Sequence, residues 1–173
     1  MEFDPHNLPK EYRFERRLNR ANFIDYSLPG FYNLTICTKD KMHWFGHVVN
    51  GKMVLSPWGN IAHEQLLWLE KQFQHIRLDG FVVMPNHVHV IVEIRRDVVG
   101  NGRDRSLQKP IPELMGAFKT TSSKIIHQRG LPGFRWQKSY YDRLLRTDDE
   151  LEHARWYIRT NPERWYRDRN NDK

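Results

Sequence analysis

The chain has 173 residues, of which 39% are hydrophobic and 13% aromatic, and this composition supplies enough apolar material for one folded domain. Its single cysteine, Cys37, excludes a disulfide framework and a cysteine-based zinc site. No stretch approaches the roughly 20 apolar residues of a membrane helix, and none resembles a signal peptide. We therefore expect a soluble cytoplasmic protein without a membrane partner, built as a single domain over residues 1–173.

The formal net charge of +7 is distributed unevenly along the chain. Basic and acidic residues balance over residues 1–94, at 10 each, and nearly balance over residues 147–173, at 6 against 7. The excess lies in residues 95–146, which carry 12 basic and 4 acidic side chains. An excess of this kind suits a polyanion such as nucleic acid, and it is equally typical of a solvated basic surface.

The first half of the chain predicts an arm, a strand, a hairpin and a helix. Residues 1–28 are polar and rich in Arg and Asn, and we interpret them as an N-terminal arm. Aromatic and β-branched residues predict a strand over 31–38, and Asn50-Gly51 between two short apolar runs predicts a hairpin. Ser56-Pro57 is typical of a helix start, and the apolar period extends that helix to about His75.

The second half predicts two adjacent strands, a helix, a strand and a last helix. Residues 76–84 and 87–94 are β-rich and flank Pro85-Asn86, which favours an antiparallel pair. The remaining expected elements are a mobile loop over 97–109, a helix over 110–129 that stops at Gly130, a strand over 140–146, and a helix from 148 to about Asn161 with Thr147 as N-cap and Glu150 completing a capping box. Without the hairpin and the last helix, the order is βαββαβ. The sequence therefore predicts an α+β fold of the ferredoxin-like, split-βαβ type, with an antiparallel sheet, an inserted small hairpin and a C-terminal helix.

Two histidines stand two residues apart on the strand over 87–94. Because side chains alternate along a strand, His87 and His89 point to one face, while Val88 and Val90 point to the other. Two imidazoles at this spacing can share a divalent cation. Surface histidines, or histidines paired by hydrogen bonds, give the same pattern, so this pair alone leaves the question open.

The last helix carries a second pair of polar residues. Tyr157 and Asn161 are neighbours at i and i+4, on the border of the apolar stripe formed by Leu151, Ala154 and Ile158. At that border, a hydroxyl and a carboxamide can both reach a metal held by a neighbouring strand. A tyrosine at the edge of the core and a helix-ending Asn before a proline would also explain the pair.

Three segments together resemble the HUH single-tyrosine transposases, especially the branch of REP-associated tyrosine transposases. They are MPNHVHVIVEI at 84–94, WQKSYYDRLLR at 136–146 and YIRTNP at 157–162. The stretch FYNLTICTKD and the later GKMVL are also similar to that branch, so the resemblance covers about residues 31–165.

The resemblance implies a role for each matched residue. His87 and His89 match the two histidines of the family's metal motif, Asn161 stands where a polar helix residue completes the metal site, and Tyr157 matches the nucleophilic tyrosine. Tyr140 and Tyr141 are rival nucleophiles that rank below Tyr157. The implied activity is cleavage and rejoining of single-stranded DNA beside palindromic hairpins through a 5′-phosphotyrosine, with Mg²⁺ or Mn²⁺ as cofactor and with a nucleoid-associated monomer or homodimer as the active form.

Other functions share parts of this pattern. An HUH replication initiator or relaxase has the same metal and tyrosine chemistry, a domesticated binding module keeps the fold without cutting, and a metal-dependent hydrolase cuts without a covalent adduct. The basic segment gains a role as the DNA-binding surface, where Trp136 could stack on unpaired bases with Phe134 and Tyr140, or belong to the core. The candidate DNA contacts are Arg95, Arg96, Arg103, Arg105, Lys109, Lys119, Lys124 and Trp136.

Overall fold

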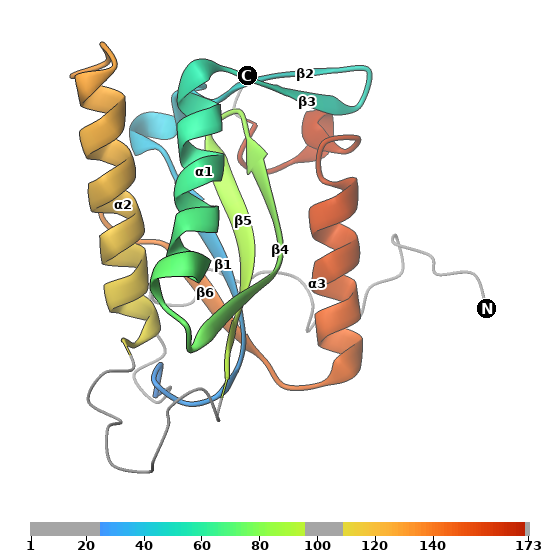
Figure 1. Ribbon diagram of the computed structural model, residues 1–173. Helices are drawn as coiled ribbons and strands as arrows, with labels where there is room; N and C mark the ends of the chain where they lie inside the picture. Colours follow the sequence, from blue (N-terminus) through green and yellow to red (C-terminus); the bar gives the residue numbers. More distant parts are fainter. Residues whose placement is uncertain (1–24, 96–108, 172–173) are drawn as a thin grey trace.

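The fold was analysed in a computed structural model, which describes residues 25–95 and 109–171 (Figure 1). The strands are β1 (Gly30–Cys37), β2 (Gly46–Val49), β3 (Lys52–Leu55), β4 (Ile76–Met84), β5 (His87–Ile94) and β6 (Tyr141–Leu145). The helices are α1 (Pro57–Gln72), α2 (Ile111–Gln128) and α3 (Asp148–Thr160), with the short 3-10 turns η2 (Lys39–Lys41) and η4 (Trp165–Arg167). This order confirms the sequence of elements that the patterning predicts.

Four strands form an antiparallel sheet in the order β4-β5-β1-β6. Helix α1 connects β1 to β4, and helix α2 connects β5 to β6, so two strand-helix-strand units interleave in one sheet. This is the split-βαβ, ferredoxin-like arrangement expected from the sequence. The inserted hairpin, β2 with β3, forms a separate two-stranded sheet between β1 and α1.

The two faces of the sheet are covered by different helices (Figure 1). Helices α1 and α2 lie on one face, where alternate residues of β1 and β5 join them in the main core. Helix α3 lies on the opposite face, over a smaller apolar cluster. That cluster consists of Ile91, Leu145, Leu151, Ala154 and Ile158. Since His87 and His89 have the same parity on β5 as Ile91, they face α3.

Local chemistry explains where the hairpin and α1 begin. Asn50 and Gly51 both have positive φ, 50° and 72°, as a tight two-residue hairpin turn requires. Ser56 caps α1, because its side chain accepts a hydrogen bond from Gly59 N at 3.1 Å. Helix α1 ends at Gln72 rather than at His75, because Phe73 already has extended backbone angles and the chain turns into β4.

The cap of α3 departs by one residue from the predicted capping box. Thr147 accepts a hydrogen bond from Glu150 N at 3.2 Å, as expected for an N-cap. The carboxylate of Glu150, however, accepts from the backbone N–H of Arg146 at 2.6 Å, one residue before the N-cap, and it also pairs with Arg143. Glu150 therefore ties the first turn of α3 to the end of β6.

The parts of the chain interpreted as an arm and a loop are described only in part. Residues 1–24 and 96–108 lie outside the described residues, which leaves Asp25–Leu28 and Lys109. Within the described part, Tyr26 donates a hydrogen bond to Asp142 on β6, and its carbonyl accepts from Ile111 N at 3.2 Å. Helices long and apolar enough to cross a bilayer are absent from the described ranges.

Two glycines in helices provide a matched test of this packing. A Cβ on Gly59 would lie 2.2 Å from the carbonyl oxygen of Phe45, whereas a Cβ on Gly116 in α2 would meet nothing within 4 Å. We expect Gly59→Ala to lower the free energy of unfolding by about 1–3 kcal/mol, despite the higher helix propensity of alanine, because backbone must move. Gly116→Ala should raise it by about 0.5–1 kcal/mol. Urea denaturation of both variants checks the pair, and a stabilising Gly59→Ala would contradict the close approach of α1 to the hairpin.

Candidate metal centre and tyrosine site

The turn between β4 and β5 places the first histidine. Pro85 and Asn86 form this turn, and both are held by the backbone of neighbouring loops: Phe45 N donates to Pro85 O at 2.9 Å, and Thr38 N donates to Asn86 O at 2.8 Å. The Asn86 side chain donates from Nδ2 to the carbonyl oxygens of Lys41 and Asn170, at 3.1 and 2.7 Å. These two bonds leave Oδ1 of Asn86 as an acceptor.

That acceptor determines the tautomer of His87. The Nδ1 atom of His87 lies 2.8 Å from Asn86 Oδ1, so Nδ1 carries the proton and donates it. The lone pair is then on Nε2. Orientation of a histidine through its other ring nitrogen is the usual arrangement when Nε2 binds a metal.

His89 is held in a similar way by a residue of the adjacent strand. Its Nδ1 atom lies 2.8 Å from Thr35 Oγ1, on the directly paired position of β1. The rings of His87 and His89 are 4.5 Å apart and nearly perpendicular. Both Nε2 atoms are buried and have no hydrogen-bond partner within the described part of the chain. Buried polar atoms without partners are costly, which indicates that a ligand satisfies them.

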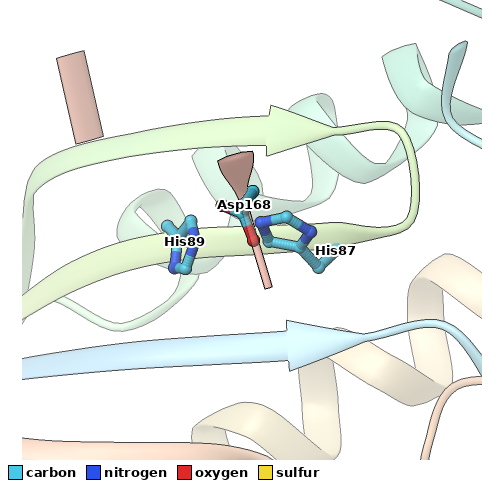
Figure 2. A group of neighbouring side chains, drawn as sticks. All are labelled: His87, His89 and Asp168. Carbon is cyan, nitrogen blue, oxygen red and sulfur yellow. The ribbon is translucent and has the colours of Figure 1, made fainter. Parts of the chain in front are cut away.

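A carboxylate from the C-terminal segment completes the group. Asp168 follows η4 and brings an oxygen to the two histidines, so that one ligand atom of each residue lies within 4.8 Å of the others (Figure 2). Sequence analysis missed Asp168, because it lies in an irregular segment with no periodicity or motif. The only available signal was an acidic side chain close enough along the chain to fold back from Pro162.

Asp168 also connects this group to α3. Its Oδ2 accepts hydrogen bonds from Tyr157 Oη at 3.2 Å and from Asn161 Nδ2 at 3.0 Å, and its Oδ1 accepts from Asn170 N at 2.7 Å. The structure thus brings together all four residues expected at the site, with the Tyr157 and His89 rings 5.1 Å apart. The Oδ1 atom of Asn161 is a further buried oxygen without a partner among the described residues.

Burial dominates the electrostatics of the site. Burial lowers the pKa of His87 well below 6.5, and the neighbouring imidazole of His89 lowers it further. Burial also lowers the pKa of His89 to about 4, although the charge of Asp168 partly opposes this shift. Burial and then the charge of Asp168 raise the pKa of Tyr157 to about 12. At neutral pH the histidines are therefore neutral, as metal ligands must be, and Tyr157 is a protonated phenol.

The residues present fit a divalent cation. Two buried neutral imidazoles whose Nε2 atoms have no partner among the described residues, one half-buried carboxylate and one spare carboxamide oxygen form a mixed N/O donor set. Imidazole with carboxylate suits first-row divalent ions, and Mn²⁺ accepts it more readily than Mg²⁺, which prefers oxygen alone. A cation here would also lower the cost of ionising Tyr157.

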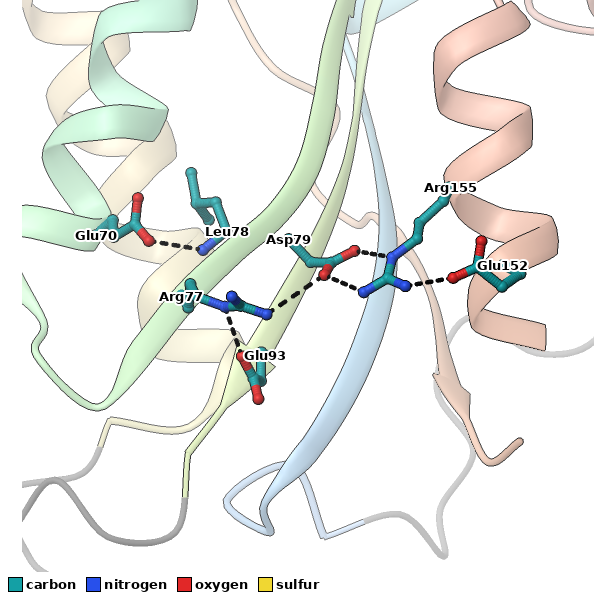
Figure 3. Close-up of polar contacts among 7 residues, drawn as sticks. All are labelled: Glu70, Arg77, Leu78, Asp79, Glu93, Glu152 and Arg155. Atoms are coloured by element: carbon teal, nitrogen blue, oxygen red, sulfur yellow. Dashed lines mark hydrogen bonds and ion pairs between the residues drawn. The ribbon is translucent and has the colours of Figure 1, made fainter. Parts of the chain in front are cut away.

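An ion-pair network fixes α3 relative to the sheet (Figure 3). Arg155, two residues before Tyr157, donates from Nε and Nη2 to the two carboxylate oxygens of Asp79 on β4, at 2.7 and 2.5 Å. The Asp79 side chain is only 5% exposed, and Arg77 also contacts it at 3.5 Å. A bidentate pair restricts orientation as well as distance, so it determines where Tyr157 lies over β5.

Most of the predicted DNA contacts that the structure describes already have partners in the protein. Arg95 donates to the carbonyls of Gln74 and Ile76, and Lys109 pairs with Glu113. The ammonium of Lys119 donates to three carbonyls, those of Gln137, Lys138 and Ser139. Lys124 is exposed on α2, and Arg96, Arg103 and Arg105 lie outside the described residues.

Of the two interpretations of Trp136, a base-stacking residue or a core residue, the structure supports the core residue. Its side chain is 9% exposed, its Nε1 donates to Ser122 Oγ at 3.0 Å, and its ring packs on Phe45 and Phe118. Phe134 and Tyr140 are buried in the same cluster. Base stacking by these three aromatic residues is therefore a prediction that the packing corrects, since their rings are enclosed between the sheet and α2.

The fold is similar to the folds of two solved transposase structures. The fold is similar to that of a REP-associated tyrosine transposase bound to a REP hairpin, with a TM-score of 0.54 and 16% identity over 84% of this chain and 74% of the other. It is also similar to that of a candidate transposase from Deinococcus radiodurans, with a TM-score of 0.50 and 18% identity over 81% and 95% of the two chains. The chain thus has the fold of these transposases.

In sequence, the chain is 32% identical to an uncharacterized protein of Haemophilus influenzae, over 88% of this chain and 91% of the other. The chain belongs to the same family as that Haemophilus protein. No family model matches it.

The depressed pKa values of the buried histidines predict a pH-dependent stability. Because both imidazoles stay neutral when folded but ionise near pH 6.5 when unfolded, their contribution to the free energy of unfolding is fully present above pH 6.5 and decreases as pH falls below it, the part due to His89 being lost towards pH 4. Each histidine should contribute a slope of up to about 1.4 kcal/mol per pH unit. Urea unfolding with a chelator present measures the slope. His89→Gln should flatten it, whereas His47→Gln, at an exposed position of β2, should leave it unchanged; equal slopes in wild type and His89→Gln would contradict the shift.

Proposed function

We propose that the protein is a metal-dependent single-tyrosine HUH transposase that cleaves and rejoins single-stranded DNA beside hairpin sequences, acting at the nucleoid. One observation carries the proposal: the half-buried Tyr157 hydroxyl and Asp168 carboxylate lie together with the buried Nε2 atoms of His87 and His89, which have no partner among the described residues. The structural similarity to a transposase bound to a REP hairpin supports the choice of substrate.

The proposed ligands are Nε2 of His87, Nε2 of His89 and the carboxylate of Asp168, with Oδ1 of Asn161 completing the set. Mn²⁺ or Mg²⁺ is the proposed ion. When bound, it would supply positive charge that offsets the charge developing on the scissile phosphate. Lys124, at the surface of the described basic segment, is the proposed contact to the DNA backbone.

The covalent step needs a nucleophile and an acceptor for its proton. Tyr157 Oη attacks the phosphorus, an Oη–P bond forms, and the bond from phosphorus to the 3′ oxygen breaks. The phenolic proton passes to Asp168 Oδ2, which already accepts it at 3.2 Å, and the departing 3′ oxygen takes a proton from solvent. The phosphodiester is conserved as a 5′-phosphotyrosine, so a second 3′ hydroxyl can displace Tyr157 without an external energy source.

Tyr157→Phe tests the reaction class. We expect the variant to keep its fold and its affinity for hairpin DNA but to form no covalent adduct, because only the attacking oxygen is lost. The assay is denaturing gel electrophoresis after incubation with labelled single-stranded hairpin DNA and Mn²⁺, followed by peptide mapping. Tyr166→Phe, at an exposed tyrosine of η4, is the matched control and should form adduct normally. Metal-dependent cleavage without adduct in wild type would indicate a hydrolase instead, and DNA binding without cleavage would indicate an inert binding module.

Asp168→Asn tests the ligand set independently of cleavage. Loss of the only carboxylate in the group should weaken Mn²⁺ binding by about 100-fold, whereas Asn161→Ala, which removes a neutral oxygen, should weaken it by about tenfold. Titration calorimetry or the Mn²⁺ electron paramagnetic resonance signal, in the Tyr157→Phe background, measures both. Undiminished Mn²⁺ affinity in Asp168→Asn would remove Asp168 from the set.

A further inference from the structure

Tyr141, in the segment at 136–146 that resembles the transposases, lies on the same sheet face as His87 and His89, which with Asp168 are called the metal group below. Thr35 of β1 pairs with His89 on one side and with Tyr141 of β6 on the other. Directly paired residues of an antiparallel sheet point to the same face, so these three side chains form a row across the sheet. Tyr141 stands two strands from His89, roughly 10 Å away.

At this distance Tyr141 lies beside the metal group but does not belong to it. Tyr157, with its ring 5.1 Å from that of His89, already occupies the position of a nucleophile. Tyr141 lies on the edge strand of the sheet and is 44% exposed, while the neighbouring Tyr140 is buried in the main core. An aromatic ring is therefore presented to solvent at a distance of about three stacked nucleotides from the site.

A cation lies over this ring. The guanidinium of Arg169 is 5.5 Å from the centroid of Tyr141, and the backbone of Arg169 is tied down by Lys41, whose ammonium donates to its carbonyl at 3.1 Å. The same guanidinium lies near enough to the site to lower the pKa of His87, of His89 and of Tyr157. Arg169 follows Asp168 directly, so one short segment brings a carboxylate to the metal group and a cation to its rim.

We propose that Tyr141 and Arg169 form a nucleotide-binding subsite, in which the tyrosine ring stacks on an unpaired base of the scissile strand and the guanidinium contacts the adjoining phosphate. The proposal rests on the proposed function, because it assumes a single-stranded DNA substrate.

The chemistry of the pair suits this ligand. A tyrosine ring stacks on any base, since every base has an aromatic face, and this makes the contact tolerant of sequence. A guanidinium combines a planar face for stacking with donors that match phosphate oxygens. A solvated edge tyrosine would explain the exposure of Tyr141 alone, but it would not explain why a cation anchored at the rim of the metal group lies over the ring.

A double-mutant cycle between protein and DNA tests the subsite. The probes are a labelled hairpin with a short single-stranded thymidine flank, the same hairpin with one flank base replaced by an abasic site at each position in turn, and the hairpin without a flank. Binding is measured in the Tyr157→Phe background with a chelator, so that neither cleavage nor metal enters. Tyr141→Ala should weaken binding of the flanked hairpin about tenfold and leave the unflanked hairpin unchanged. At one flank position, an abasic site should weaken binding by the wild-type tyrosine protein about as much as Tyr141→Ala does. Tyr141→Ala should then bind this abasic hairpin no more weakly than it binds the intact one.

The controls separate this subsite from general effects. Tyr141→Phe keeps the ring and should restore binding of the flanked hairpin, and Arg169→Gln should weaken binding and flatten its salt dependence by about one phosphate contact. Tyr166→Ala removes another exposed ring from the same region and should change nothing. Additive losses from Tyr141→Ala and every abasic site, or an equal loss in Tyr166→Ala, would overturn the subsite even if wild type forms the tyrosine adduct. Absence of both adduct and hairpin binding in wild type would instead reject the proposed function.

Discussion

The burial of two imidazoles on one face of β5 is the constraint on which the rest of the structure depends. Period-two alternation gives His87 and His89 the same face as Ile91, beneath α3, where both imidazoles are buried. Each Nδ1 is satisfied by a neighbour fixed in the backbone framework, Asn86 in the turn and Thr35 on β1. The two Nε2 atoms are left without a partner among the described residues. Desolvation then keeps both rings neutral, so the same burial that is costly to stability prepares the pair to bind a cation.

Helix α3 has to be placed accurately on this face although its apolar contact with the sheet is small. Among the described residues, the apolar cluster that joins α3 to the sheet contains five buried residues, three of them on α3 itself, whereas the core under α1 and α2 is much larger. Polar contacts compensate at two points along the helix. Glu150 ties the first turn to β6, and the bidentate pair of Arg155 with Asp79 holds the middle to the edge strand β4. A helix held only by apolar packing could slide or rotate, whereas directed ion pairs restrict both motions. The position of Tyr157 therefore depends on residues that do not touch the metal group.

The elements, the His87 and His89 pair and the Tyr157 and Asn161 pair could be predicted from sequence because they follow local rules. Alternation gave the strand of His87, the i and i+4 spacing related Tyr157 to Asn161, and cap and turn residues marked the helix starts. Asp168 could not be predicted, since its place depends on how an irregular segment folds back after Pro162. The sequence also did not determine whether Trp136 is buried, because an aromatic residue near basic side chains can belong to a core or to a nucleic-acid-binding surface.

Charge counted along the chain also differs from charge arranged in space. The excess of residues 95–146 pointed to a binding surface there, yet within the described residues Arg95 and Lys119 donate to backbone carbonyls, and Arg143 pairs with Glu150. The charge of Arg169, from a segment in which acidic residues slightly outnumber basic ones, lowers the pKa of His87, of His89 and of Tyr157. A net charge counts ion-paired and other charged side chains alike, whereas the electrostatic potential at a site depends on how far away each charge lies. One guanidinium, that of Arg169, lies over the exposed ring of Tyr141 and near His87 and His89, and only the fold of the C-terminal segment could bring it there.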